Sequence, residues 1–198
     1  MPHIEITNDL PGISGLMAQR PDTGAVLSSV AETLLRSGAS PLSRGERELI
    51  AAYVSHLNRT DFCADSHSAF AAAQLDGGAE LVASVRADVA TAPVSPLLKT
   101  LLAVAAEVQA KAAPVSDEAV AAARAAGATD THLHDTVLIA AAFSMFNRYV
   151  NGLATDVPAD PAYYAFAAER IVEHGYGSAS ADAGADAGAG EVVGAGAR

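Results

Sequence analysis

The stretch SRGERELIAAYVSHLNRTDFCADSHSAFAAA, residues 43–73, decides the fold because it encodes two consecutive helices and the break between them. Ser43 and Glu46 match the S-x-x-E pattern of a capping box, which predicts a helix that runs to about Leu57. A short polar break follows. The second helix is expected to begin at Asp61 or at the next residue and to lie antiparallel to the first.

Signals of the same kind recur along the chain and predict six further helices. They are capping residues, prolines at first helical positions and glycines at helix ends. The expected ranges are 22–38, 79–88, 96–111, 116–127, 130–152 and 161–174. The first twenty residues are expected to be irregular, and no strand pattern occurs anywhere in the sequence. The prediction is an all-α bundle of about eight helices.

The composition places these helices in one domain and limits the partners. A chain of 198 residues can bury a substantial core without covalent cross-links. The domain is expected to span residues 1–174. A net charge of −11 with only 12 lysines and arginines argues against nucleic acid as a partner, because phosphate binding needs clustered basic residues.

The last residues, 175–198, are expected to form a disordered tail. Their sequence, GYGSASADAGADAGAGEVVGAGAR, is dominated by Gly, Ala, Ser and Asp. Such a segment cannot bury enough apolar surface to offset the entropy lost on ordering.

Cysteine usage and hydropathy indicate a cytoplasmic protein. A single cysteine excludes an intrachain disulfide and agrees with a reducing compartment. No apolar run reaches the roughly 18 residues of a membrane span, and the N-terminus lacks the pattern of a signal peptide. Neither a membrane nor an export route is therefore expected.

The single cysteine, Cys63, falls in the first turn of the second helix, where unpaired backbone N–H groups favour a thiolate. A helix terminus contributes about 0.3–1 kcal/mol, less than the roughly 1.4 kcal/mol that one pKa unit represents. Cys63 therefore needs a base. His67 lies one turn along the same helical face, and Glu48 on the preceding helix could face both. Together they could deprotonate a nucleophile and return a proton to a leaving oxygen.

Two other interpretations of the same residues stay open at this point. A lone cysteine in an alanine-rich helix is often a small buried hydrophobic residue, and His67 could be a structural histidine. A zinc site built from Glu48, Cys63 and His67 is conceivable, but it lacks the paired Cys or His spacing of known zinc sites. We therefore predict no metal.

The stretch 43–73 resembles the core of the alkylhydroperoxidase D-like, carboxymuconolactone decarboxylase-like superfamily. The pattern of that superfamily is a Glu followed by C-x-x-C-x-x-x-H, and Glu48, Cys63 and His67 match the Glu, the second cysteine and the histidine. The flanking segments LPGISGLMAQRPDTG and LIAAAFSMFNRYVNGLAT resemble the peroxidase-related subgroup; they are residues 10–24 and 138–155.

The sequence departs from the superfamily pattern at two positions. Thr60 stands where the first cysteine of the pair is expected, and Phe62 stands where some members have a second histidine. In the superfamily, the second cysteine attacks the peroxide and the first resolves the resulting sulfenic acid. Thr60 has no thiol and cannot resolve a sulfenic acid. A sulfenic acid at Cys63 would therefore need an external thiol as reductant.

The resemblance implies thiol-dependent reduction of hydroperoxides, an antioxidant peroxidase activity, without a metal or organic cofactor. Cys63 would be the nucleophile, Glu48 and His67 the proton relay, and Thr60 and Phe62 residues of the substrate pocket or relay. The resemblance also implies a homo-oligomer, a trimer or hexamer.

The resemblance leaves two alternatives. One is acid–base chemistry on a small organic acid, as in carboxymuconolactone decarboxylase, with Glu48 and His67 as the working pair and Cys63 uninvolved. The other is a non-catalytic helical oligomer.

Overall fold

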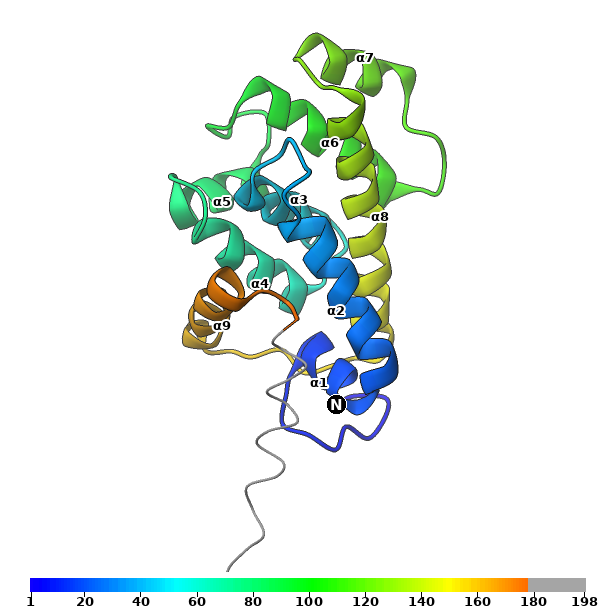
Figure 1. The fold of residues 1–198 in the computed structure, drawn as a ribbon, viewed down its shortest axis with the longest axis vertical. Coiled ribbons are helices and arrows are strands. Elements are labelled where there is room, and N and C mark those ends of the chain that lie inside the picture. Colours follow the sequence, from blue (N-terminus) through cyan, green and yellow to red (C-terminus); the bar gives the residue numbers. More distant parts are fainter. Residues whose placement is uncertain (178–198) are drawn as a thin grey trace, which may run out of the picture.

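The computed structural model describes residues 1–177, which fold into nine α-helices with no strand among them (Figure 1). The helices are α1 (Gly12–Gln19), α2 (Pro21–Arg36), α3 (Arg44–Leu57), α4 (Asp61–Ala72), α5 (Gly78–Ala87), α6 (Pro96–Ala110), α7 (Asp117–Ala125), α8 (Asp130–Gly152) and α9 (Pro161–His174). The predicted all-α class is confirmed. No helix in this part of the chain is long and apolar enough to cross a membrane.

Helix α1 contradicts the expectation that the first twenty residues are irregular. Its sequence contains two glycines and its N-cap, Pro11, makes no side-chain cap, so local propensity is weak. Packing stabilises it instead, because Leu16 is buried and Gly12 lies against the ring of Phe62. Such contacts with a distant part of the chain leave no local signature in the sequence.

The capping box that opens α3 forms as predicted. The Ser43 hydroxyl accepts from the Glu46 N–H at 3.2 Å, and the Glu46 carboxylate accepts from the Ser43 N–H at 2.8 Å. At the other end, Arg59 takes a left-handed conformation with φ of +54° and reverses the chain into α4. Helices α3 and α4 therefore pack closely as an antiparallel pair.

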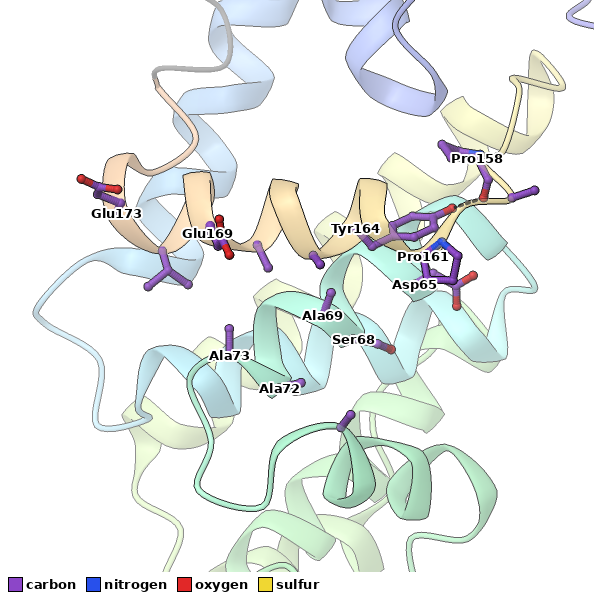
Figure 2. Close-up of a pocket in the computed structure, with 15 residues that line it drawn as sticks. Asp65, Ser68, Ala69, Ala72, Ala73, Pro158, Pro161, Tyr164, Glu169 and Glu173 are labelled. Atoms are coloured by element: carbon purple, nitrogen blue, oxygen red, sulfur yellow. Dashed lines mark hydrogen bonds between the residues drawn. The ribbon is translucent and has the colours of Figure 1, made fainter.

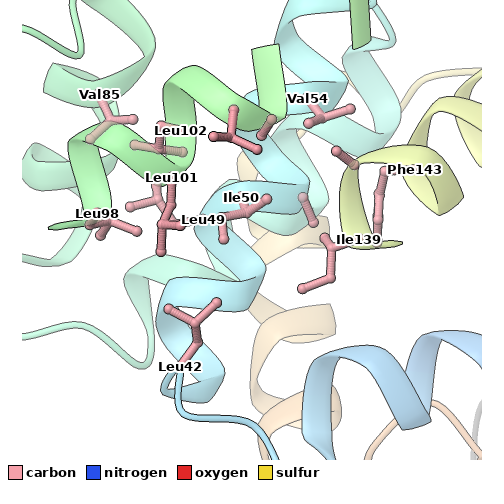
Figure 3. Close-up of a cluster of buried hydrophobic side chains, with 14 of the residues drawn as sticks. Leu42, Leu49, Ile50, Val54, Val85, Leu98, Leu101, Leu102, Ile139 and Phe143 are labelled. Carbon is pink, nitrogen blue, oxygen red and sulfur yellow. The ribbon is translucent and has the colours of Figure 1, made fainter. Parts of the chain in front are cut away.

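The main core surrounds α3, with α6 and α8 on its sides (Figure 3). Side chains of these three helices meet there with almost no exposed surface; they include Leu49, Ile50, Val54, Leu101, Leu102, Ile139 and Phe143. Each such side chain contributes about 1.5–3 kcal/mol of hydrophobic free energy on burial. Helix α3 is thus held rigidly, and so is any polar residue that it carries.

Helix α9 lies along α4 at the edge of the bundle (Figure 2). An open groove of about 980 Å³ runs between these helices, lined largely by alanines and prolines with Asp65, Glu169 and Glu173 among the polar residues.

The packed structure continues past the expected domain boundary at residue 174. Tyr176 packs against Phe70 of α4, with ring centroids 6.4 Å apart. The remainder of the expected tail, residues 178–198, lies outside the described residues.

Gly12 provides a test of the packing of α1. It has φ of +58°, and a Cβ there would overlap the Phe62 ring. We expect Gly12→Ala to lower the free energy of unfolding by about 2–4 kcal/mol, because left-handed strain and overpacking each cost on the order of 1–3 kcal/mol. Gly152→Ala is the control, since its Cβ would meet nothing within 4 Å and its φ is not positive. Equal denaturation midpoints for the two variants would contradict this account.

Candidate active site

A buried hydrogen bond between Glu48 and His67 joins α3 to α4. Glu48 is 1 % exposed, and its Oε2 lies 2.7 Å from Nδ1 of His67. A carboxylate in an apolar core is tolerated only when it is paired and hydrogen-bonded. The predicted approach of Glu48 and His67 is therefore present in the structure.

Aromatic side chains fix the orientation of the His67 ring. The edge of the imidazole meets Phe143 of α8 at 4.6 Å and Phe70 of α4 at 5.2 Å between ring centroids. The whole residue is 8 % exposed. The imidazole is thus held in one plane by α4 and α8 and is hydrogen-bonded to α3.

Tyr176 completes this group. It could not be predicted from the sequence, because it lies in the Gly-rich segment that was expected to be disordered. Its hydroxyl donates to Oε1 of Glu48 at 2.7 Å and lies 3.5 Å from Nδ1 of His67. Burial, and then the Glu48 carboxylate, raise the pKa of Tyr176 well above its ordinary value. Tyr176 is therefore a neutral donor to Glu48.

Cys63 faces a different set of partners. It is 3 % exposed and packs with Phe62, Val150 and Tyr164. Burial raises the pKa of the thiol to about 12, and a hydrogen bond with Asn147 of α8 opposes only part of that rise. Within residues 1–177, no hydrogen bond joins Cys63 to His67 or Glu48. The spacing of four residues puts sulfur and imidazole on one face of α4, but the two groups have different hydrogen-bond partners.

Thr60 and Phe62 both serve packing between helices. Thr60, and not Asp61, is the N-cap residue of α4, and its Oγ1 accepts from Asn151 Nδ2 of α8 at 2.9 Å instead of capping the helix. Phe62 is 4 % exposed and lies against Gly12. The structure therefore gives both residues structural contacts, and a role in a substrate pocket stays a prediction.

Neither a metal site nor the large groove involves the predicted residues. In the part of the chain that the structure describes, no three His, Cys, Asp or Glu side chains are arranged to hold a metal ion. The zinc alternative thus lacks a ligand set. None of Glu48, Thr60, Phe62, Cys63 and His67 lines the groove between α4 and α9.

Comparisons with known proteins agree with this fold. Residues 21–107, which include Glu48, Cys63 and His67, match the carboxymuconolactone decarboxylase family. A crystal structure from Ralstonia eutropha, described as an alkylhydroperoxidase AhpD core and an uncharacterized peroxidase-related protein, superposes with a TM-score of 0.70 at 23 % identity, covering 79 % of this chain and 80 % of that one.

A second crystal structure, an uncharacterized peroxidase-related protein from a Silicibacter species, gives a TM-score of 0.69 at 25 % identity and covers 78 % of each chain. The chain is thus similar to the carboxymuconolactone decarboxylase family over residues 21–107, and its fold is similar to that of these two peroxidase-related proteins. The resemblance inferred from residues 43–73 is thereby confirmed. No curated protein matches the sequence significantly.

The burial of Cys63 leads to a prediction about the reactivity of its thiol. A thiol with a pKa of about 12 is ionised in roughly one molecule in 10⁴ at pH 8, against about a quarter for an ordinary thiol. We therefore expect iodoacetamide to alkylate the native protein roughly 10³-fold more slowly than the denatured protein at that pH. Cys63→Ser serves as the blank. A native rate equal to the denatured rate would show an accessible, activated thiolate.

Proposed function

We propose that the protein is an acid–base enzyme that acts on a small organic acid or lactone acid, with Glu48 and His67 as the working pair. The observation that supports this proposal is the 2.7 Å contact between two buried ionisable side chains, Glu48 and His67. A carboxylate paired with an imidazole inside an apolar site is the arrangement of a general acid–base group. The family matched by residues 21–107 is named for such a reaction, a decarboxylation.

In this proposal the two ring nitrogens of His67 have distinct roles. Nδ1 donates its proton to Glu48, as in other carboxylate–histidine pairs, and Nε2 is left to exchange a proton with the substrate. In a decarboxylation, the bond between the carboxylate carbon and its neighbour breaks and carbon dioxide leaves. The electron pair stays on the neighbouring carbon, and this carbon takes up a proton that Nε2 of His67 has first accepted from solvent.

Cys63 has no chemical role in this proposal. Its thiol stays protonated at neutral pH because burial raises its pKa to about 12. Thr60, at the position of the partner cysteine, cannot form a disulfide with it. The loss of the cysteine pair is therefore consistent with chemistry that needs no redox cycle.

Two substitutions distinguish catalysis by the His67 imidazole from catalysis by the Cys63 thiol. In His67→Asn, the amide nitrogen can replace Nδ1 toward Glu48 but nothing replaces Nε2, so decarboxylation of lactone or β,γ-unsaturated acids should fall by at least about 10²-fold. Cys63→Ser should keep most of the activity, because serine preserves a small polar group beside Asn147. Release of carbon dioxide is the measurement. A loss in Cys63→Ser equal to that in His67→Asn would refute the assignment.

A second candidate is a one-cysteine peroxidase. It is favoured by the position of Cys63, the third residue of α4 and one turn from His67, and by the two solved structures that are described as peroxidase-related. The thiol would take one oxygen from a hydroperoxide, giving an alcohol and a sulfenic acid. Two external thiols would then reduce the sulfenic acid, giving a disulfide and water.

This candidate makes its own prediction. If it is correct, consumption of a small hydroperoxide in the presence of excess dithiothreitol should fall to the uncatalysed rate in Cys63→Ser, because only a sulfur nucleophile forms a sulfenic acid. Loss of peroxide is followed against a blank without protein. Equal consumption by wild type and Cys63→Ser would remove the peroxidase candidate and leave the acid–base proposal in place.

A further inference from the structure

The short segment after α9 brings a tyrosine to the Glu48–His67 pair from the far end of the chain. From this arrangement we infer that Tyr176 is a positioning residue, which holds the Glu48 carboxylate and thereby fixes the tautomer of His67. The inference deepens the proposed function and rests on it for its catalytic meaning. It makes Gly175 and Tyr176 part of the proposed active site.

A glycine turn directs the chain from α9 back to the core. Gly175 has φ of +77°, and its N–H donates to the Ile171 carbonyl at 3.0 Å as the helix ends. A Cβ at this position would lie 2.5 Å from Oε2 of Glu32 and 3.0 Å from Nε of Arg36. The positive φ therefore favours glycine, and a side chain there would also displace the Glu32 carboxylate.

Side chains of α2 hold this turn in place. The Tyr176 N–H donates to Oε2 of Glu32 at 2.8 Å, and Arg36 donates to the carbonyls of Ile171 and Val172 at 2.7 and 3.3 Å. Arg36 and Glu32 also form an ion pair at 3.3 Å. The backbone of Tyr176 is thus fixed independently of its side chain, and the phenol is presented to the core in a defined position.

The phenol then occupies one oxygen of the Glu48 carboxylate. Tyr176 donates to Oε1 at 2.7 Å, which leaves Oε2 to face Nδ1 of His67 at the same distance. The phenol ring also stacks on the imidazole, with an interplanar angle of 21° and centroids 6.3 Å apart. With Glu48 unable to rotate, the Nδ1–H tautomer of His67 is favoured and Nε2 keeps its lone pair for proton transfer.

The charged groups around the phenol keep it protonated. Glu48 faces its hydroxyl, while Glu32 and Arg36 of α2 face its backbone and His67 lies beside its ring. Burial and the two carboxylates raise the pKa of Tyr176, and Arg36 opposes them weakly. The tyrosine therefore acts as a fixed donor across the working pH range, and it does not exchange a proton with the substrate itself.

Tyr176→Phe removes the hydroxyl and keeps the stacked ring. In wild type, nitrogen-15 spectra of the histidine ring nitrogens should show His67 as a single Nδ1–H tautomer, assigned by its absence in His67→Asn. Tyr176→Phe should give a mixture of tautomers. Its kcat should fall roughly tenfold with little change in KM, the rate equivalent of one hydrogen bond to a charged group.

Tyr164→Phe is the matched control, because it deletes another buried tyrosine hydroxyl, one that donates to the Pro158 carbonyl at 3.0 Å. It should leave the His67 tautomer and kcat unchanged. Gly175→Ala is a second test that leaves the phenol intact, and it should also give mixed tautomers because the turn must shift.

The outcomes separate this inference from the proposed function. A single His67 tautomer in Tyr176→Phe and Gly175→Ala, with kcat unchanged, would overturn the role of Tyr176 even if His67→Asn is inactive. If the wild type decarboxylates none of the acids, the proposed function fails, and the tautomer spectra still decide whether Tyr176 positions the pair.

Discussion

The structure depends on one buried carboxylate. Glu48 lies in the first half of α3 and is 1 % exposed, directly before Leu49 and Ile50 of the main core. An isolated charge there would cost many kcal/mol, so the fold must bring donors to it. One comes from α4, as His67, and the other from the segment after α9, as Tyr176. Helix α4 and the segment after α9 therefore both contact the Glu48 carboxylate.

Cys63 belongs to a different polar network from the one around Glu48. Asn147 of α8 donates to Ser55 of α3 at 3.0 Å and accepts from Asn58 in the turn at 2.9 Å. The same asparagine hydrogen-bonds Cys63. The Cys63 thiol thus takes part in the hydrogen bonds that hold the α3–α4 turn against α8. His67, one turn later, is hydrogen-bonded to Glu48 instead.

Features with local signatures were predictable from the sequence, and features that depend on distant contacts were not. Ser43 and Glu46 predict the start of α3, because a capping box involves only four consecutive residues. The approach of Glu48 and His67 follows from an antiparallel pair of helices. Helix α1 was missed, and so was Tyr176, which meets Glu48 across 128 positions of sequence. The partner of Cys63 could not be foreseen either, since a helical spacing fixes a face and not a contact. The oligomer and the cytoplasmic location stay predictions.

The late position of Tyr176 has a consequence for how the protein is made. Helices α3 and α4 are synthesised before α5 to α9, so the Glu48–His67 contact can form while the later helices are still being added. The phenol and the glycine turn are synthesised only after α1 to α9, and Oε1 of Glu48 gains its donor at that stage. A nascent chain interrupted before Gly175 would carry the packed helices with the Glu48–His67 pair lacking this hydrogen bond.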